Sequence, residues 1–275
     1  MTVELMEPFA SAWRGKDPFH ELETMPGETF KQKDNRRVFR FEFAGENWFA
    51  KVHHGVGWRE IVKNLLSLRR PILSARNEWD AIKVFESLGV ATLEAAGFGE
   101  RGTDPARRDS FLITREVKHF LTLEELADQW STLSEPLRMK RTLINELARI
   151  SRRLHDNGVN HRDYYLCHFL LEVPQGLERV LEQPLLIRVV DLHRAMMTGS
   201  STNIRWREKD LGALLYSSLH IGLTRRDIFR FIRVYTGLPL RQALQQRASL
   251  WTRVWRRARA FHMEGYGVPA PPLFP

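Results

Sequence analysis

The sequence lacks cysteine pairs, long apolar runs and a leading hydrophobic segment, and each absence excludes a class of protein. Its single cysteine, Cys167, rules out an internal disulfide and suits a reducing compartment. No apolar run approaches the roughly 18 residues of a membrane-spanning helix, so no span is expected. Residues 1–10 carry Glu4 and Glu7 and lack the layout of a secretory signal.

Positive charge is abundant instead. The chain has 42 Lys and Arg against 33 Asp and Glu, a net charge of +9, and arginines crowd residues 225–259. Such a surface favours an anionic partner: a nucleic acid, an anionic membrane, a phosphorylated substrate or an acidic protein. The alternative is a solvated basic surface with no single partner.

Hydrophobic patterning predicts strands first and helices later. The expected elements are a hairpin over 37–54, a helix over 74–88, a strand over 111–114, a long helix over 135–157 and helices from about 205. Thr122 and Glu125 have capping-box spacing for a short helix. This order predicts an α+β protein with a small β-rich lobe over residues 1–117 and a larger helical lobe over 118–275.

The motif that directs the functional reading is His161-Arg162-Asp163, which follows the long helix and precedes an apolar run. A protein-kinase-like catalytic loop has this layout: the aspartate accepts the proton of a substrate hydroxyl, and a metal ligand follows five residues later. Asp163 is therefore the candidate base. His168 occupies the later position, where kinases usually carry asparagine. Imidazole is a poor Mg²⁺ ligand but binds Mn²⁺, and a packed histidine is the alternative.

Such a loop also requires a phosphate-binding lysine with a glutamate partner. Lys51 lies among apolar neighbours on the second arm of the predicted hairpin, although an edge-strand lysine could simply face water. Glu78 shares a helical stripe with Ile82 and Phe85, where a carboxylate needs a cation, unless it is an exposed first-turn acid. Glu60 is a competitor, but a Lys/Arg-rich segment that resembles an insertion follows it.

A second acid is expected at a strand end. Asp191 follows the apolar run that ends at Val190, which is the layout of a metal-binding aspartate, or of an acid that merely turns the chain. One carboxylate suffices because Mg²⁺ takes its other ligands from phosphate and water. A zinc site is disfavoured, since one cysteine and scattered histidines match no zinc spacing.

Two expected kinase features are missing. Residues 30–40 contain basic side chains but no glycine-rich phosphate loop, and no Ala-Pro-Glu activation segment is present. Both absences argue against a conventional protein kinase.

Longer strings carry a closer likeness. The chain resembles the lipopolysaccharide core heptose(I) kinases of Gram-negative bacteria, which are related to protein kinases. The strings that carry the likeness are Trp13-Arg14-Gly15-Lys16-Asp17-Pro18-Phe19, Asn160-His161-Arg162-Asp163, Cys167-His168-Phe169-Leu170-Leu171, Asp191-Leu192-His193-Arg194-Ala195 and Arg205-Trp206-Arg207-Glu208-Lys209-Asp210-Leu211.

The resemblance implies a two-lobed kinase fold and ATP-dependent phosphorylation of the first inner-core heptose at its 4-hydroxyl, with Mg²⁺ or Mn²⁺. It implies Asp163 as base, Lys51 (with Glu78) as phosphate-binding lysine and Asp191 as metal ligand, with His168 usual for the family. The expected location is cytoplasmic, peripheral to the inner membrane. Expected partners are the lipopolysaccharide inner core, an anionic membrane surface and an acidic carrier such as acyl carrier protein, with no nucleic acid.

Two other readings remain open. One is another atypical kinase that acts on a protein or on a soluble small-molecule hydroxyl. The other is a non-catalytic basic scaffold that binds a polyanion. The segment from Leu240 to Phe261, with leucines and tryptophans between arginines, is either a helix for a membrane surface or acidic partner, or an ordinary helix with a basic outer face.

Overall fold

A computed structural model describes residues 1–33, 35–66 and 74–272. Contacts divide the chain into two compact units, each described by itself. Unit 1 contains Met1–Val84 and Leu93–Val117, and unit 2 contains Phe85–Thr92 and Lys118–Pro275. Residues 85–92 thus belong with unit 2, although a single boundary near residue 117 was expected. Hydrogen bonds explain this, because Arg153 donates to the carbonyls of Leu88 and Gly89.

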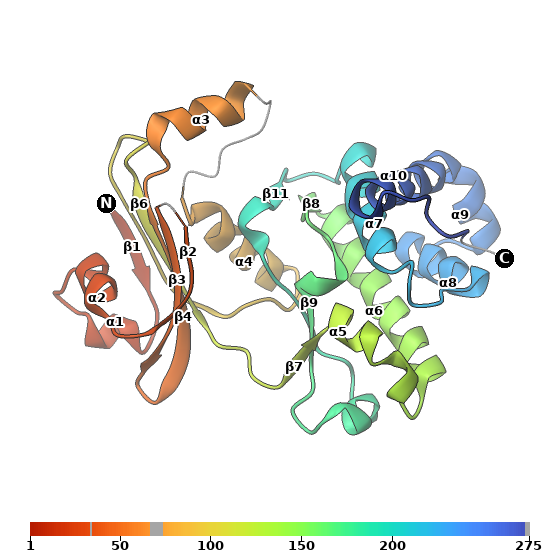
Figure 1. Cartoon of the computed structure of the whole chain (residues 1–275), viewed down its shortest axis with the longest axis horizontal. Coiled ribbons are helices and arrows are strands. Elements are labelled where there is room, and N and C mark those ends of the chain that lie inside the picture. The colour runs from red at the N-terminus through yellow and green to blue at the C-terminus, as the bar shows by residue number, and fades with distance from the viewer. Residues whose placement is uncertain (34, 67–73, 273–275) are drawn as a thin grey trace. The chain divides into compact units, whose positions relative to one another are not determined.

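Unit 1 is built on a six-stranded antiparallel sheet with the order β1-β5-β6-β4-β3-β2 (Figure 1). Its strands are β1 (Thr2–Leu5), β2 (Glu28–Lys33), β3 (Arg36–Phe43), β4 (Glu46–His54), β5 (Ala95–Arg101) and β6 (Asp109–Arg115). Its helices are α1 (Phe9–Ala12), α2 (Pro18–Thr24), α3 (Gly57–Leu66) and most of α4 (Arg76–Ser87).

The β3–β4 hairpin confirms the expected pair of strands. Ala44 and Gly45 both have positive φ, as the two central residues of a type I′ turn require. Phe41 pairs with Trp48, and both join the buried cluster that α1 and α2 cover. Because side chains alternate between the faces of a strand, Lys51 faces away from this cluster.

Helix α4 matches the expected helix over 74–88. Glu78, Ile82 and Phe85 are all buried, so the predicted stripe is the buried face of the helix. The Glu60 side chain lies outside the described residues, and so do residues 67–73 of the segment read as an insertion.

Unit 2 is mainly helical. Its strands form two small sheets, β10-β9-β7 and β11-β8. They are β7 (Phe120–Thr122), β8 (Val159–Asn160), β9 (Phe169–Glu172), β10 (Ile187–Val189) and β11 (Met196–Met197). The helices are α5 (Leu123–Asp128), α6 (Pro136–Asp156), α7 (Ile204–Ser217), α8 (Arg225–Thr236), α9 (Leu240–Gln246) and α10 (Ala248–Tyr266). Short 3-10 turns are η1 (Trp130–Thr132), η2 (Leu166–His168), η3 (Leu177–Glu182) and η4 (Leu192–Arg194).

Two helix signals in the sequence are confirmed in unit 2. The Thr122 side chain accepts from the Glu125 amide while Glu125 reaches back to the Thr122 amide, a complete capping box for α5. Helix α6 covers nearly all of the expected long helix and ends just before Gly158, whose φ is +75°. It places the chain at β8, from which the catalytic loop begins.

The segment from Leu240 to Phe261 differs from the single helix expected. It forms α9 and α10, which meet at Arg247. Leu250 and Val254 are buried in a core cluster with Ala148, Leu211 and Tyr235, and Trp251 packs against it. The apolar face is therefore covered by unit 2, and the exposed face carries the arginines. No helix within the described ranges is long and apolar enough to cross a membrane.

Candidate active site

The loop that carries Asp163 is held between two short strands. It leaves β8, which pairs antiparallel with β11, so Asn160 lies opposite Met196. The chain that carries Asp191 leads into the same small sheet. Residues 36 positions apart in sequence, Asn160 and Met196, are thereby placed side by side.

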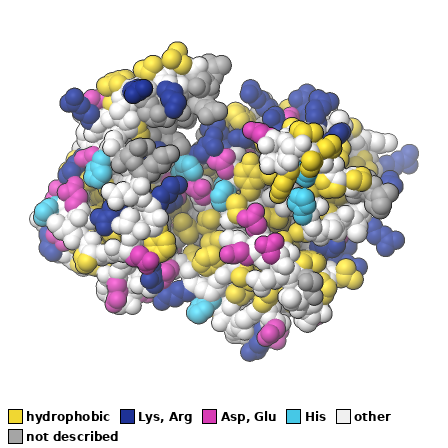
Figure 2. Space-filling view, viewed as in Figure 1, with side chains coloured by type: hydrophobic (Ala, Val, Ile, Leu, Met, Phe, Trp, Pro, Cys, Tyr) yellow, Lys and Arg dark blue, Asp and Glu magenta, His cyan; other side chains and the backbone are white. Residues whose placement is uncertain are grey.

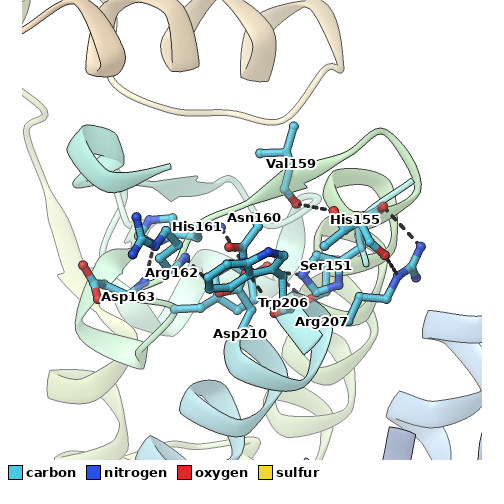
Figure 3. Close-up of polar contacts among 12 residues, drawn as sticks. Ser151, His155, Val159, Asn160, His161, Arg162, Asp163, Trp206, Arg207 and Asp210 are labelled. Carbon is cyan, nitrogen blue, oxygen red and sulfur yellow. Dashed lines mark hydrogen bonds and ion pairs between the residues drawn. The ribbon is translucent and has the colours of Figure 1, made fainter. Parts of the chain in front are cut away.

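A buried carboxylate beneath the loop determines its shape (Figure 3). Asp210 on α7 is 1% exposed. Its Oδ2 accepts from the backbone N of His161 at 2.8 Å, and its Oδ1 accepts from the backbone N of Arg162 at 2.8 Å. His155 Nε2 lies 3.3 Å from Oδ2. Burial alone raises the pKa of Asp210, but its hydrogen bonds and the charges of His155 and His161 lower the pKa below the usual aspartate value.

The two loop residues before Asp163 show the effect of this carboxylate. Arg162 has a φ of +76°, a left-handed conformation that costs a non-glycine residue about 1–2 kcal/mol. The hydrogen bond from its amide to Asp210 offsets this cost. The Nε2 atom of His161 lies 2.9 Å from the carbonyl oxygen of Val190. Its Nδ1 atom accepts a hydrogen bond from the backbone amide of Asp163 at 3.3 Å. These contacts require a neutral imidazole with the proton on Nε2, and burial lowers its pKa accordingly.

The Asp163 carboxylate faces cationic side chains. Arg194 Nη1 donates to both Asp163 oxygens at 3.0 Å. The carboxylate is 18% exposed and the arginine side chain 36%, so the pair is accessible. A guanidinium in this position neutralises the carboxylate and fixes its orientation.

The opposite end of Asp163, its backbone carbonyl, faces His168. Nδ1 of His168 lies 2.6 Å from this carbonyl, and Nε2 lies 3.6 Å from Oδ2 of Asp191. The Cys167 side chain contributes most to raising the pKa of His168, to about 9; the Asp163 carbonyl and the Asp191 charge add to this against the opposing effect of burial. His193 Nδ1 contacts the other Asp191 oxygen.

These residues fit a divalent cation in a limited way. The described His, Cys, Asp and Glu side chains form no group of three or more that could hold a metal ion. Mg²⁺ needs only one or two carboxylates when phosphate supplies further oxygens, and Asp191 is 38% exposed. A metal that bound His168 Nε2 would first have to displace its proton. The donor set therefore suits a metal that arrives with a nucleotide.

In unit 1, Lys51 and Glu78 form an ion pair. Lys51 Nζ lies 2.6 Å from Glu78 Oε1, with side-chain exposures of 26% and 4%. The lysine is not an outward edge residue, because β4 lies inside the sheet and Lys51 faces α4. The carboxylate compensates the charge of the lysine while leaving part of it accessible to an anion.

Arg194, Lys209 and Asp210 were not identified as site residues from the sequence. A signal for Asp210 exists: it shares a helical stripe with Trp206 and Ala213, so an acid interrupts a face that should be apolar. Nothing in the spacing indicates Arg194, whose partner lies 31 residues away.

We expect Asp210→Asn to lower the free energy of unfolding by about 3 kcal/mol, because an amide cannot accept from all the donors around it. The folded-state pKa of Asp210 lies below that of an unfolded aspartate, about 3.9. The stabilisation by ionised Asp210 is therefore complete at a pH above the unfolded-state pKa. It is lost as the pH falls through the lower pKa of Asp210 in the folded state. Chemical denaturation across pH checks both points. Asp128→Asn, at an exposed aspartate, is the control; equal stability of the two variants would contradict the role of Asp210.

Comparison with known proteins agrees with this geometry. Residues 20–235 match the model of the lipopolysaccharide kinase (Kdo/WaaP) family. The lipopolysaccharide core heptose(I) kinase WaaP of Escherichia coli is 46% identical over 256 residues, 93% of this chain and 95% of that protein. The protein of the same name from Pseudomonas aeruginosa is 44% identical over 262 residues, 95% of this chain and 96% of that protein.

A solved structure described as WaaP in complex with acyl carrier protein superposes with a TM-score of 0.80 at 39% identity, and covers 95% of this chain and 100% of that one. The mixed fold, with a β-rich sheet and a helical C-terminal part, is therefore shared with a kinase structure. The chain belongs to the lipopolysaccharide kinase (Kdo/WaaP) family, and it is accordingly a phosphotransferase that uses ATP with a divalent metal.

Proposed function

We propose that this protein transfers the γ-phosphoryl group of ATP to the 4-hydroxyl of the first inner-core heptose of lipopolysaccharide, with Asp163 as the base. The observation that carries the proposal is the constrained presentation of Asp163. Buried Asp210 holds the preceding amides, and His168 connects the Asp163 carbonyl to Asp191. Full-length identity of 44–46% to heptose(I) kinases supports heptose as acceptor.

In this mechanism each residue has one task. Asp163 accepts a hydrogen bond from the acceptor hydroxyl and takes its proton as the oxygen attacks phosphorus. Lys51, positioned by Glu78, binds the α- and β-phosphates. Asp191, together with His168 once deprotonated, holds Mg²⁺ or Mn²⁺. The metal neutralises charge on the phosphate oxygens when bound.

We expect Asp163→Ala to lower kcat by about 10²- to 10⁴-fold without a change in the melting temperature of more than a few degrees. The measurement is ADP release with a dephosphorylated lipopolysaccharide core, followed by mass and NMR assignment of the phosphate on the product. Asp128→Ala is the matched exposed control. Near-normal turnover of Asp163→Ala would remove it as the base.

The acceptor is tested separately. The same assay with peptides and soluble hydroxyl compounds distinguishes a heptose kinase from another atypical kinase. If the wild-type enzyme with saturating Mg-ATP returned the heptose acceptor unmodified, the proposed substrate would be wrong. Phosphate on another hydroxyl of the same heptose would correct the position alone.

We further propose that the protein works on the cytoplasmic side of the inner membrane, as a peripheral protein on anionic lipid. Helix α3 supports this, because Trp58, Val62 and Leu66 are spaced four apart and are 57%, 48% and 82% exposed. Arg59 and Lys63, both exposed, lie beside this stripe. Figure 2 shows hydrophobic side chains along the outer edge of α3, with Lys and Arg side chains beside them. Such a helix lies in the interface of an anionic bilayer.

We expect Trp58→Ser with Leu66→Ser to weaken binding to vesicles of anionic phospholipid by about tenfold or more, because two apolar side chains no longer enter the interface. Cosedimentation measures the change. Leu137→Ser, at an exposed leucine of α6, is the control. Equal binding of all variants, or equal binding to zwitterionic vesicles, would contradict the proposal.

An acidic acyl carrier protein is proposed as a protein partner. The solved relative with that partner supports it, and so does the basic outer face of α8 to α10. Arg256 and Arg259 on α10 are exposed, lie three residues apart and therefore project from one side of the helix.

We expect Arg256→Glu with Arg259→Glu to weaken association with purified acyl carrier protein and to reduce its salt sensitivity, because opposite charges then become like charges. Isothermal titration at two ionic strengths measures both effects. The same reversal at Arg14 and Lys16 in unit 1 is the control. Binding that depends on neither reversal nor salt would contradict an electrostatic interface.

A further inference from the structure

Three cationic side chains of unit 2, Arg194, Lys209 and Arg162, lie close to the loop that carries Asp163. Arg194 pairs with the Asp163 carboxylate directly. The charges of Asp163, Arg162 and Arg194 all affect the pKa of Lys209 on α7. The guanidinium of Arg162 lies 5.5 Å from the centre of the Trp206 ring, one helical turn before Lys209.

Lys209 is the least compensated member of this group. Within the ranges that the structure describes, its ammonium makes no hydrogen bond and no ion pair. It is only partly exposed, and its neighbour Asp210 is occupied by the catalytic loop. Burial, together with Arg162 and Arg194, lowers the pKa of Lys209, while Asp163 opposes this. A lysine kept in such a place is costly for the free protein.

We propose that Arg194 and Lys209, with Arg162 beside them, form a binding site for an oxyanion, a carboxylate or phosphate substituent of the acceptor that lies next to the hydroxyl to be phosphorylated. This inference rests on the proposed function, since it describes how the acceptor is recognised. The binding of an anion would give the ammonium of Lys209 the partner that it lacks among the described residues.

The position of the site relative to Asp163 favours the acceptor over the nucleotide. The backbone of Asp163 faces His168, which contacts the candidate metal ligand Asp191. Its carboxylate faces Arg194 on the other side of the residue. Nucleotide phosphates accompany the metal, whereas the acceptor hydroxyl must lie at the carboxylate. An anion held by Arg194 and Lys209 therefore belongs with the hydroxyl.

The chemistry also explains why Arg194 contacts the base. In the free protein it neutralises Asp163 and so prevents an unpaired carboxylate beside water. An acceptor anion offers the guanidinium a second bidentate partner. When Arg194 also contacts that anion, one Asp163 oxygen becomes available to the acceptor hydroxyl. Binding of the acceptor and exposure of the base therefore occur together.

Lys209→Met tests the site, because it removes the charge and keeps much of the side-chain volume. We expect the KM for the acceptor to rise about 10- to 100-fold, the effect of losing a hydrogen bond to a charged group. The KM for ATP should stay unchanged. The melting temperature should stay equal or rise, since repulsion from Arg162 and Arg194 is relieved. Lys209→Arg should retain most of the affinity, and Arg205→Met, an exposed residue of the same helix, is the control.

The source of the anion is read from three acceptors: the native core glycan, the same glycan with its carboxyl groups reduced, and the same glycan treated with phosphatase. If the difference between wild type and Lys209→Met disappears with one modified glycan, the proposal holds and the anion is identified. If Lys209→Met lost kcat equally with every acceptor, Lys209 would contact the transferred phosphoryl group instead of an acceptor anion, and the proposal would be overturned.

Titration calorimetry of each glycan into the enzyme gives a readout that does not need turnover. Wild type and Lys209→Met that bind the native glycan equally would overturn the anion site even if the enzyme phosphorylates heptose normally. Weaker binding by the variant, with phosphate found on a sugar other than heptose, would retain the site and correct the proposed substrate instead.

Discussion

The loop of unit 2 that carries Asp163 depends on one buried carboxylate. Asp210 is removed from water, and a charged group there is tolerated only because backbone and imidazole donors surround it. The two backbone donors belong to His161 and Arg162, the residues directly before Asp163. The hydrogen bonds that make the burial of Asp210 acceptable therefore also hold Arg162 in its left-handed conformation and fix where the Asp163 side chain begins. The stability of the loop and the positioning of Asp163 arise from the same contacts.

Charge is balanced differently in the two units. In unit 1, Lys51 forms an ion pair with buried Glu78 and stays partly exposed. In unit 2, Arg194 neutralises Asp163 while Lys209 adds a further positive charge without a partner of its own in the described structure. The partly buried ammonium of Lys209 is unfavourable in the free protein. An anionic ligand that binds beside it would supply the missing charge.

Elements whose signals are local were predicted well. The β3–β4 hairpin follows from strand alternation and a turn at Ala44 and Gly45, and the start of α5 follows from the Thr122 capping box. The sequence left two alternatives open where the pattern gives an apolar face but not the partner of that face. The residues from Leu240 to Phe261 have an apolar face that suits a surface or a core equally. Only the packed structure shows that Leu250 and Val254 belong to the core of unit 2.

By itself the sequence determined the family and singled out Asp163 as the candidate base, because the residues around Asp163 are contiguous and their spacing is characteristic. It also indicated Lys51 and Glu78 through their places on a strand and a helix. The tertiary structure alone decided the surroundings of the base. Arg194 lies 31 residues after its partner Asp163 in the sequence. Asp210 lies 49 residues after His161, whose amide it accepts from. Contacts over such separations depend on how β8, β11 and α7 pack, and no local periodicity records that packing.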